Sequence, residues 1–272
     1  MSVRVRDLLM AELGALRFEP TQKRIRATLE GRTVIDSTRA LLVWEPKRVV
    51  PTYAVPIADI DGELDAAPDG IAAIGAPELG GRAVLDPSIP FSVHTVDGEP
   101  MSVRARGGGV AAAAFVPSDP LLEDVVLLDF AAFDAWYEED ERNVAHPRDP
   151  FHRIDIVHSS RAVRIELDGT VLAESGRACL LFEPPLPVRY YVLAEDVRTE
   201  LLDPSETRSA CAYKGEASYL ALPGAGDVAW TYRAPLREAE EVRDRIAFFN
   251  EHVDIVVDGE RLERPVTPWS RR

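Results

Sequence analysis

The residues best suited to chemistry in this sequence lie between Cys211 and Tyr219, where a thiol, an amine and two phenols surround a glycine. A nearby ammonium lowers the pKa of a thiol, so Lys214 would make Cys211 a better nucleophile or metal ligand. The same pattern also describes a strand and turn with a small buried cysteine and a solvated lysine. No motif assigns a base or an oxyanion hole, so both interpretations stay open for the catalytic candidates Cys211 and Lys214.

A set of one arginine, one glutamate, one tyrosine and one aspartate occurs twice at nearly the same spacing. The two copies are Arg39, Glu45, Tyr53 and Asp59, and Arg177, Glu183, Tyr190 and Asp196. Such a set lines a polar pocket when the arginine holds a carboxylate or phosphate through two hydrogen bonds. It equally describes polar contacts that tie two sheets together. The candidate ligand-binding residues are Arg177, Glu183, Tyr190, Asp196, Tyr219, Trp230 and Tyr232.

Between the two copies lies a charged stretch, residues 146–158, which Pro147 and Pro150 make extended and stiff. Two histidines without a clear third ligand are weak grounds for a metal ion, and the sequence assigns no metal site. Salt bridges between domains are the simpler interpretation. The residues expected to contact the other domain or a ligand are His146, Arg148, Asp149, His152 and Arg153.

Similar sequences on either side of this stretch indicate an internal duplication. Residues 24–31 and 162–169 both alternate apolar and polar residues and end in an acidic residue and glycine, which is the pattern of a β-hairpin. The alignment predicts a glycine turn kept in both copies, with cysteine and lysine in the second only. The aligned segments further on are 94–98 with 211–215, in which His94 matches Cys211, and 113–115 with 230–232.

Short alternating segments and frequent turn residues predict a mainly β chain with two tandem homologous domains. An amphipathic helix is expected over residues 4–17, and residues 62–87 are expected to form a loop insert in the first copy. The expected parts are a helical N-terminal extension (1–20), a first β repeat (21–145), the linker (146–158) and a second β repeat (159–272).

The composition limits the partners. A formal net charge of −15 argues against a nucleic-acid partner, which needs clustered lysine and arginine. No apolar run approaches the roughly 18 residues of a membrane span, and no signal peptide is evident, so a cytoplasmic protein without a membrane partner is expected. The two cysteines, Cys179 and Cys211, indicate neither a disulfide framework nor a zinc knuckle. The sequence assigns no cofactor and no oligomeric state.

Several motifs together are typical of one family. They are Tyr190 and Asp196 after Glu-Pro, Cys211-x-x-Lys214-Gly215-x-Ala-x-Tyr219, Ala229-Trp230-x-Tyr232 and Ala247-Phe248-Phe249. In combination they resemble the family called domain of unknown function 427, which is also labelled nucleotidyltransferase-like. The linker resembles that of the tandem, two-copy type common in actinobacteria. The resemblance covers nearly the whole chain, and its motifs are specific in combination although weak singly.

This resemblance implies a compact β fold similar to the Mss4-like or β-tent arrangement, and it implies no activity. Nucleotidyl transfer needs paired carboxylates for metal ions, usually beside a phosphate-binding glycine turn. Asp59 and Asp61 are the one tempting pair, and no such turn precedes them. The nucleotidyltransferase label is therefore unsupported by motifs.

Three hypotheses remain for the function. The leading one is a module that binds a small polar ligand in a cavity of the second repeat or between the repeats. The first alternative is an enzyme that uses Cys211 or Lys214 covalently, with the first repeat as a degenerate partner. The second alternative is a structural or interaction protein without a ligand.

Overall fold

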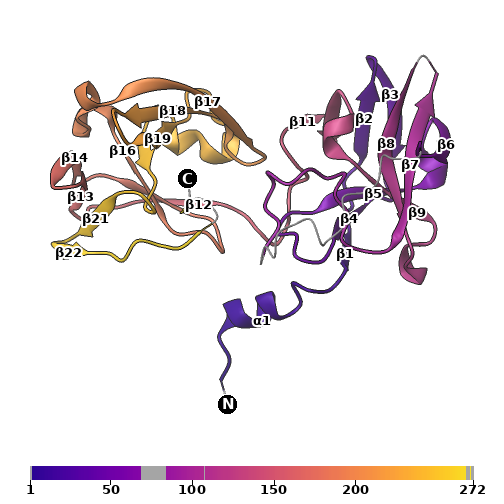
Figure 1. Cartoon of the computed structure of the whole chain (residues 1–272), viewed down its shortest axis with the longest axis horizontal. Coiled ribbons are helices and arrows are strands. Elements are labelled where there is room, and N and C mark those ends of the chain that lie inside the picture. Colours follow the sequence, from indigo (N-terminus) through magenta and orange to yellow (C-terminus); the bar gives the residue numbers. More distant parts are fainter. Residues whose placement is uncertain (1, 69–83, 107, 268–269, 271–272) are drawn as a thin grey trace. The chain divides into compact units, whose positions relative to one another are not determined.

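The computed structural model describes residues 2–68, 84–106, 108–267 and 270. The chain divides into two compact units, Met1–Asp149 and Pro150–Arg272. Each unit contains one seven-stranded and one four-stranded sheet, and the strands pair antiparallel (Figure 1). The chain is therefore mainly β with two similar tandem domains, as the sequence predicts.

In the first unit a short helix, α1 (Val5–Ala11), precedes the sheets. The larger sheet has the order β1 (Arg17–Pro20), β4 (Leu41–Trp44), β5 (Thr52–Pro56), β9 (Val125–Leu128), β8 (Gly108–Pro117), β7 (Gly98–Ala105) and β6 (Gly62–Ala66). The smaller sheet has the order β11 (Glu141–Asn143), β10 (Ala135–Glu138), β2 (Ile25–Leu29) and β3 (Arg32–Ser37).

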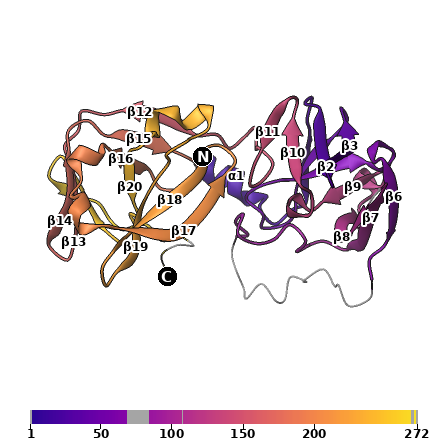
Figure 2. The same ribbon diagram turned by 90° about the horizontal axis from the view of Figure 1, so that it is seen from above.

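The second unit repeats this arrangement (Figure 2). The larger sheet has the order β12 (Asp155–His158), β15 (Cys179–Phe182), β16 (Arg189–Val192), β20 (Ile246–Phe248), β19 (Gly226–Thr231), β18 (Gly215–Leu222) and β17 (Asp203–Cys211). The smaller sheet has the order β14 (Thr170–Ser175), β13 (Val163–Leu167), β21 (Asp254–Val257) and β22 (Glu260–Arg261). The 3-10 helices of the two units are η1 (Ile57–Asp59), η3 (Pro120–Leu122), η4 (Phe130–Ala132), η5 (Ala194–Asp196), η6 (Thr199–Leu201) and η7 (Arg237–Val242).

Alternation along the strands builds the core of each unit. In β2 the alternate residues Ile25, Ala27 and Leu29 are buried, and in β13 Val163 and Ile165 are buried in the same way. These side chains fill the space between the larger and the smaller sheet. In the second unit the opposite face of the larger sheet carries another packed cluster, to which η7 contributes.

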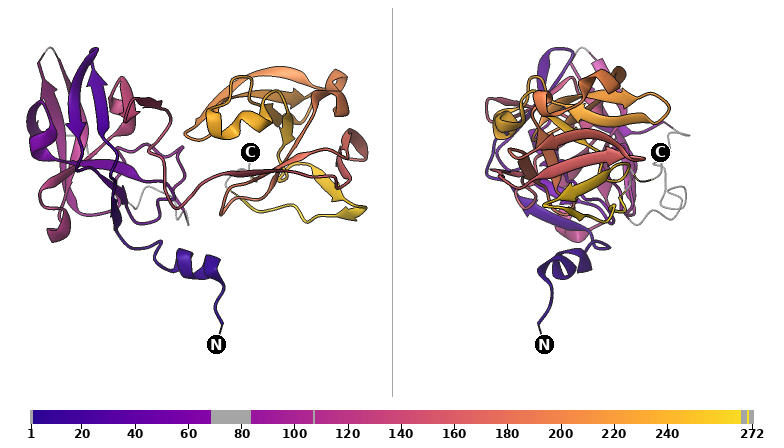
Figure 3. Two further views of the ribbon diagram at one scale, coloured as in Figure 1. Left: turned by 180° about the vertical axis from the view of Figure 1, so that it is seen from behind. Right: turned by 90° about the vertical axis from the view of Figure 1, so that its left-hand side faces the viewer.

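Four elements of the structure differ from what the sequence predicts. β1 lies in the expected N-terminal extension and β12 in the expected linker, and each forms an edge strand of a larger sheet. The helix α1 is shorter than expected (Figure 3). Its side chains Val5 and Leu8 are exposed. The expected insert over residues 62–87 begins with β6, and its residues 69–83 lie outside the described residues. Within the described residues no helix is long and apolar enough to cross a membrane.

Gly215 shapes the turn between β17 and β18. Its φ of +88° is a left-handed conformation that strains any residue with a Cβ atom. The carbonyl of the preceding residue, Lys214, accepts from the Leu236 backbone N–H at 3.1 Å. Gly98, the expected counterpart, has no positive φ and opens β7, where a Cβ atom would lie 2.3 Å from the Val116 carbonyl oxygen. The two glycines therefore serve different purposes, and the prediction of one shared turn is wrong.

We expect Gly215→Ala to destabilise the second unit by roughly 1–2 kcal/mol, because alanine resists the left-handed backbone. Chemical denaturation measures this loss. Gly176→Ala is the matched control, since Gly176 lacks a positive φ and has open space around its Cβ position. Equal effects of the two substitutions would contradict the role given to Gly215.

Candidate functional site

A single row of opposed residues crosses the larger sheet of the second unit. Each residue is the direct partner of the next across antiparallel strands, so all point to one face of the sheet. Most of them pack in the cluster on the face away from the smaller sheet. The row consists of His158, Cys179, Tyr191, Ala247, Trp230 and Tyr219.

The same row in the first unit is apolar. Its members are Pro20, Leu41, Ala54, Leu127, Phe115 and Pro100. The register makes Phe115 the counterpart of Trp230, which corrects the alignment of residues 113–115 with 230–232. The sequence alignment is shifted by two residues. A shift of two keeps every side chain on the same face of the sheet, so the pattern of alternation does not reveal it. The polar row is thus specific to the second unit.

The turn after β17 brings Lys214 to the same region. Lys214 is buried, and its ammonium donates to the carboxylate of Glu183, which follows β15. In the first unit the matching glutamate, Glu45, instead lies 3.0 Å from the Nδ1 atom of His94. His94 therefore takes the place of Lys214, and not that of Cys211, as the partner of this glutamate.

Electrostatics fix the protonation of Lys214. Burial alone would lower the pKa of its ammonium, but the neighbouring Cys211 and Glu183 side chains outweigh that effect and raise the pKa above its usual value. The amine is therefore protonated at neutral pH. It supplies a fixed positive charge and hydrogen-bond donors in place of a neutral amine nucleophile.

Two phenols lie beside this ion pair. Burial raises the pKa of Tyr191 to about 12 and raises the pKa of Tyr232 well above its usual value, so both hydroxyls keep their protons. The Tyr191 hydroxyl accepts from the Nε1–H of Trp230 at 3.0 Å. Among the described residues neither phenol hydroxyl donates to an acceptor.

The exposed side of the site is formed by Cys211 and Tyr219. Cys211 is a free, half-exposed cysteine, and its Sγ accepts weakly from the Tyr213 backbone N–H at 3.5 Å. Tyr219 is half-buried and its hydroxyl bonds to that of Ser209 at 2.8 Å. We call the whole set the Lys214 cluster, consisting of Glu183, Tyr191, Cys211, Lys214, Tyr219, Trp230 and Tyr232.

Sequence reasoning missed three polar residues of this face. Tyr191 was passed over for its neighbour Tyr190, although alternation places the two on opposite faces. Arg189 forms a two-bond ion pair with Glu251, at 2.7 and 2.8 Å, and its guanidinium lies 5.5 Å from the ring centre of Trp230. Only the register between β16 and β20 reveals this pair, since its members are far apart in the sequence.

Arg177 and Asp196 belong to a different place, where η5 meets the turn between β14 and β15. Arg177 donates to Asp196 at 2.8 Å, and the hydroxyl of Ser175 donates to the same carboxylate at 2.7 Å. Arg39 and Asp59 form the equivalent pair in the first unit, at 2.5 Å. A pair that recurs at the same turn of both units is explained by the fold.

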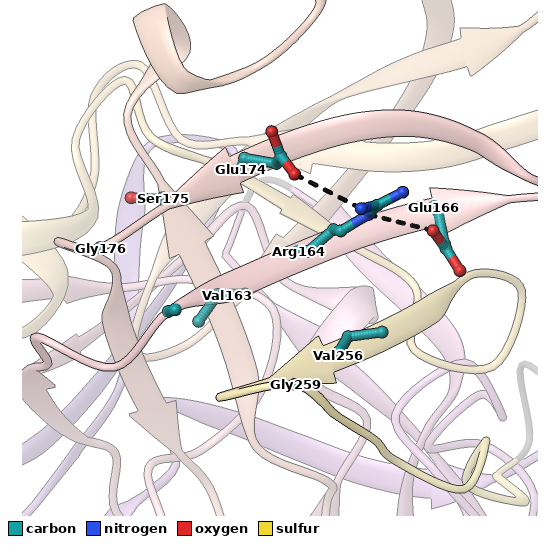
Figure 4. A pocket seen from close by; sticks show the side chains of 9 residues that line it. Val163, Arg164, Glu166, Glu174, Ser175, Gly176, Val256 and Gly259 are labelled. Carbon is teal, nitrogen blue, oxygen red and sulfur yellow. Dashed lines mark hydrogen bonds and ion pairs between the residues drawn. The ribbon is translucent and has the colours of Figure 1, made fainter.

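Tyr190 lines a cavity of about 180 Å³ together with Arg264, on the other side of the larger sheet. A wider depression of about 760 Å³ lies on the smaller sheet, where Arg164 extends between Glu166 and Glu174 (Figure 4). No residue lining these two cavities belongs to the Lys214 cluster. The expected ligand-binding residues therefore do not converge on one cavity: Arg177, Asp196 and Tyr190 are separate from the others.

The candidate residues of the linker are divided between the two units. His146, Arg148 and Asp149 belong to the first, in which Arg148 lies near Glu138 and Asp149 accepts from the Nε1–H of Trp44 at 3.1 Å. The Nδ1 atom of His146 lies 2.7 Å from the carbonyl oxygen of the next residue. These side chains stabilise the first unit from within.

The remaining two belong to the second unit. Arg153 forms an ion pair with Glu238 and lies over the ring of Tyr213, 4.9 Å from its centre. His152 is half-buried. Arg153 thus packs against the turn that carries Lys214, which gives it a supporting role next to the Lys214 cluster.

A comparison with protein families finds one matching model, described as a domain of unknown function (DUF427). It matches residues 17–70 and 155–259. The second match covers the sheets of the second unit except β22, whereas the first stops within the expected insert. No curated protein sequence matches the chain.

We expect Lys214→Met to destabilise the second unit by about 3 kcal/mol, because it leaves the Glu183 carboxylate largely buried without its partner. Chemical denaturation of the unmodified chain and of Lys214→Met measures the loss. The double variant Lys214→Met/Glu183→Leu should recover much of it, because it removes both charges. Arg198→Gln, which breaks an exposed ion pair in the same unit, should cost less than about 1 kcal/mol. A Lys214→Met loss as small as that of the control would contradict a buried ion pair.

The raised pKa of Lys214 gives a second prediction with a definite sign. A lysine whose folded pKa exceeds its unfolded value of about 10.4 stabilises the fold fully below that pH and loses the contribution as pH rises through the folded value. The difference in unfolding free energy between the unmodified chain and Lys214→Met should therefore stay constant from neutral pH to about pH 10 and shrink above it. A decline near neutral pH would indicate an amine with a lowered pKa.

Proposed function

Because the chain belongs to the DUF427 family, whose description assigns no activity, we propose its function from the geometry of its own second unit. The second unit binds a small polar molecule that carries oxygen acceptors, such as a carboxylate, a phosphate or a carbonyl group. The Lys214 cluster is the binding site.

The observation that carries this proposal is the unused hydroxyl of Tyr232. The side chain is nearly inaccessible to solvent, yet its hydroxyl makes no hydrogen bond to any described residue. The hydroxyl itself is not fully enclosed, because it is not one of the buried polar atoms that lack a partner, so it is open to water or to a ligand. A ligand with an oxygen acceptor would take the place of that water and accept a hydrogen bond from Tyr232.

The neighbours of Tyr232 favour an acceptor as the missing group. Among the residues that the structure describes, the hydroxyl of Tyr191 also finds no acceptor. The ammonium of Lys214 has three N–H donors, one of which goes to Glu183. Donors thus outnumber acceptors around the cluster. A ligand that presents oxygen acceptors completes these hydrogen bonds, and the fixed charge of Lys214 strengthens them.

Size and access also favour a small ligand. Lys214, Trp230 and Tyr232 are buried, whereas Cys211 and Tyr219 are half-exposed. A molecule of a few heavy atoms reaches the donors by displacing water at this exposed side. Trp230 supplies a flat apolar surface, and ligand sites commonly combine aromatic side chains with a small number of polar groups.

A second function, covalent catalysis at Cys211, draws on the half-exposed thiol close to the Lys214 ammonium. Iodoacetamide labelling followed over pH separates this function from simple binding. A labelling rate at neutral pH no faster than that of a free cysteine would remove its support.

We expect a thermal-shift screen of small carboxylates, phosphates and nucleotides to raise the melting temperature of the full chain. A ligand present at a hundred times its Kd stabilises a folded unit by about 2.7 kcal/mol, which corresponds to several degrees. Tyr232→Phe removes one hydroxyl and should weaken the binding of the compound found roughly tenfold.

Tyr190→Phe is the matched control, because Tyr190 points to the opposite face of the same sheet. It should leave the shift unchanged. An equal shift in Tyr232→Phe would exclude the Lys214 cluster as the site. The absence of any stabilising compound would favour a structural or interaction protein, in which water satisfies these hydroxyls.

A further inference from the structure

Three side chains with metal-binding atoms meet at the β12 edge of the second unit's larger sheet. The Sγ atom of Cys179 lies 3.2 Å from the Nδ1 atom of His158, and the Nε2 atom of the same ring lies 3.0 Å from a carboxylate oxygen of Glu241. One ligand atom from each residue falls within 4.8 Å of the others. They come from β12, from β15 and from η7, so the tertiary fold assembles them.

We propose that His158, Cys179 and Glu241 form a binding site for a divalent ion of the zinc class. A zinc ion bound to sulfur and to imidazole nitrogen at ordinary bond lengths separates the two atoms by about 3.5 Å. The Cys179–His158 distance is 3.2 Å, so a shift of a few tenths of an ångström admits the ion. The side chain of Glu241 is 53% exposed and is free to turn its carboxylate onto the ion.

The chemistry of these ligands selects the kind of ion. A thiolate and an imidazole prefer zinc and other borderline or soft ions to magnesium or calcium, which prefer oxygen. Three protein ligands leave a fourth position for water, as in exchangeable or catalytic zinc sites. On binding, the sulfur–metal bond replaces the thiol S–H bond, and the proton leaves to solvent.

The contacts of these three residues are also those of a catalytic cysteine–histidine–carboxylate triad, but the burial of Cys179 argues against a catalytic role. Cys179 has no exposed surface, and burial raises the pKa of its thiol. A nucleophile needs space for a substrate beside the sulfur, whereas a metal ion needs only room between the sulfur and the ring. His158 is largely exposed and gives the ion a path when it turns aside.

Within the described part of the first unit, the matching sheet edge carries no equivalent of this site. The register places Pro20 opposite Leu41, where the second unit has His158 opposite Cys179. The two pairs lie at the same edge of matching sheets. The difference removes both strong ligands at once, so a single site per chain is expected.

The test is a titration of the full chain with Co²⁺, followed by displacement with Zn²⁺. One equivalent of Co²⁺ should produce the near-ultraviolet charge-transfer band of a thiolate–cobalt bond, and Zn²⁺ should abolish it. His158→Gln changes an exposed side chain and should weaken Co²⁺ binding at least tenfold. Cys179→Ser should remove the band, with circular dichroism confirming that this variant is folded.

Cys211→Ser is the matched control, since it removes the other thiol and should leave the band intact. The proposal is overturned if the unmodified chain gives no thiolate–cobalt band at millimolar Co²⁺. It is also overturned if the band persists in Cys179→Ser or disappears in Cys211→Ser. Neither result bears on ligand binding at the Lys214 cluster, so the two proposals fail independently.

Discussion

The second unit depends on the register of its larger sheet. Side chains alternate between faces along each strand, and directly opposed residues on neighbouring strands share a face. The pairings from β12 to β18 therefore gather His158, Cys179, Tyr191, Trp230 and Tyr219 on one surface. A slip of one residue in any pairing would move that strand's contribution into the core between the sheets. Core packing and the polar surface are thus specified by the same register, so the apolar core also fixes the geometry of the site.

One glutamate shows how the two units came to differ on a common backbone. Glu45 and Glu183 follow equivalent strands, yet the first contacts His94 and the second contacts Lys214. In the first unit the ring of His94 stacks on Phe115 at 3.7 Å, which closes the region with an aromatic pair. In the second unit the same region holds an ammonium and two phenols, and the described residues use only part of their hydrogen-bonding capacity. The duplication therefore kept the carboxylate and changed the residues that surround it.

The fold was predictable because its signals are local, whereas much of the site depends on contacts between distant strands. Alternation and turn residues revealed the β class and the duplication. The short spacing of Cys211, Lys214 and Tyr219 indicated a common location, which the hairpin from β17 to β18 provides. The proposed metal site could not be predicted from the sequence, because His158, Cys179 and Glu241 meet only through strand pairing and the packing of η7. Repetition in the sequence is a misleading signal for Arg177 and Asp196. Both are predicted to bind a ligand, but the equivalent pair occurs in both units at the same turn, which explains why it repeats.

The proposed metal site and the Lys214 cluster are joined by Tyr191, which is the direct cross-strand partner of Cys179 and belongs to the cluster. An ion on Cys179 would tie the β12 edge to β15 and to η7, and η7 packs over the same face through Ala239 and Val242. The two proposed sites therefore share one face of one sheet, and the pairing of Cys179 with Tyr191 places them side by side on it.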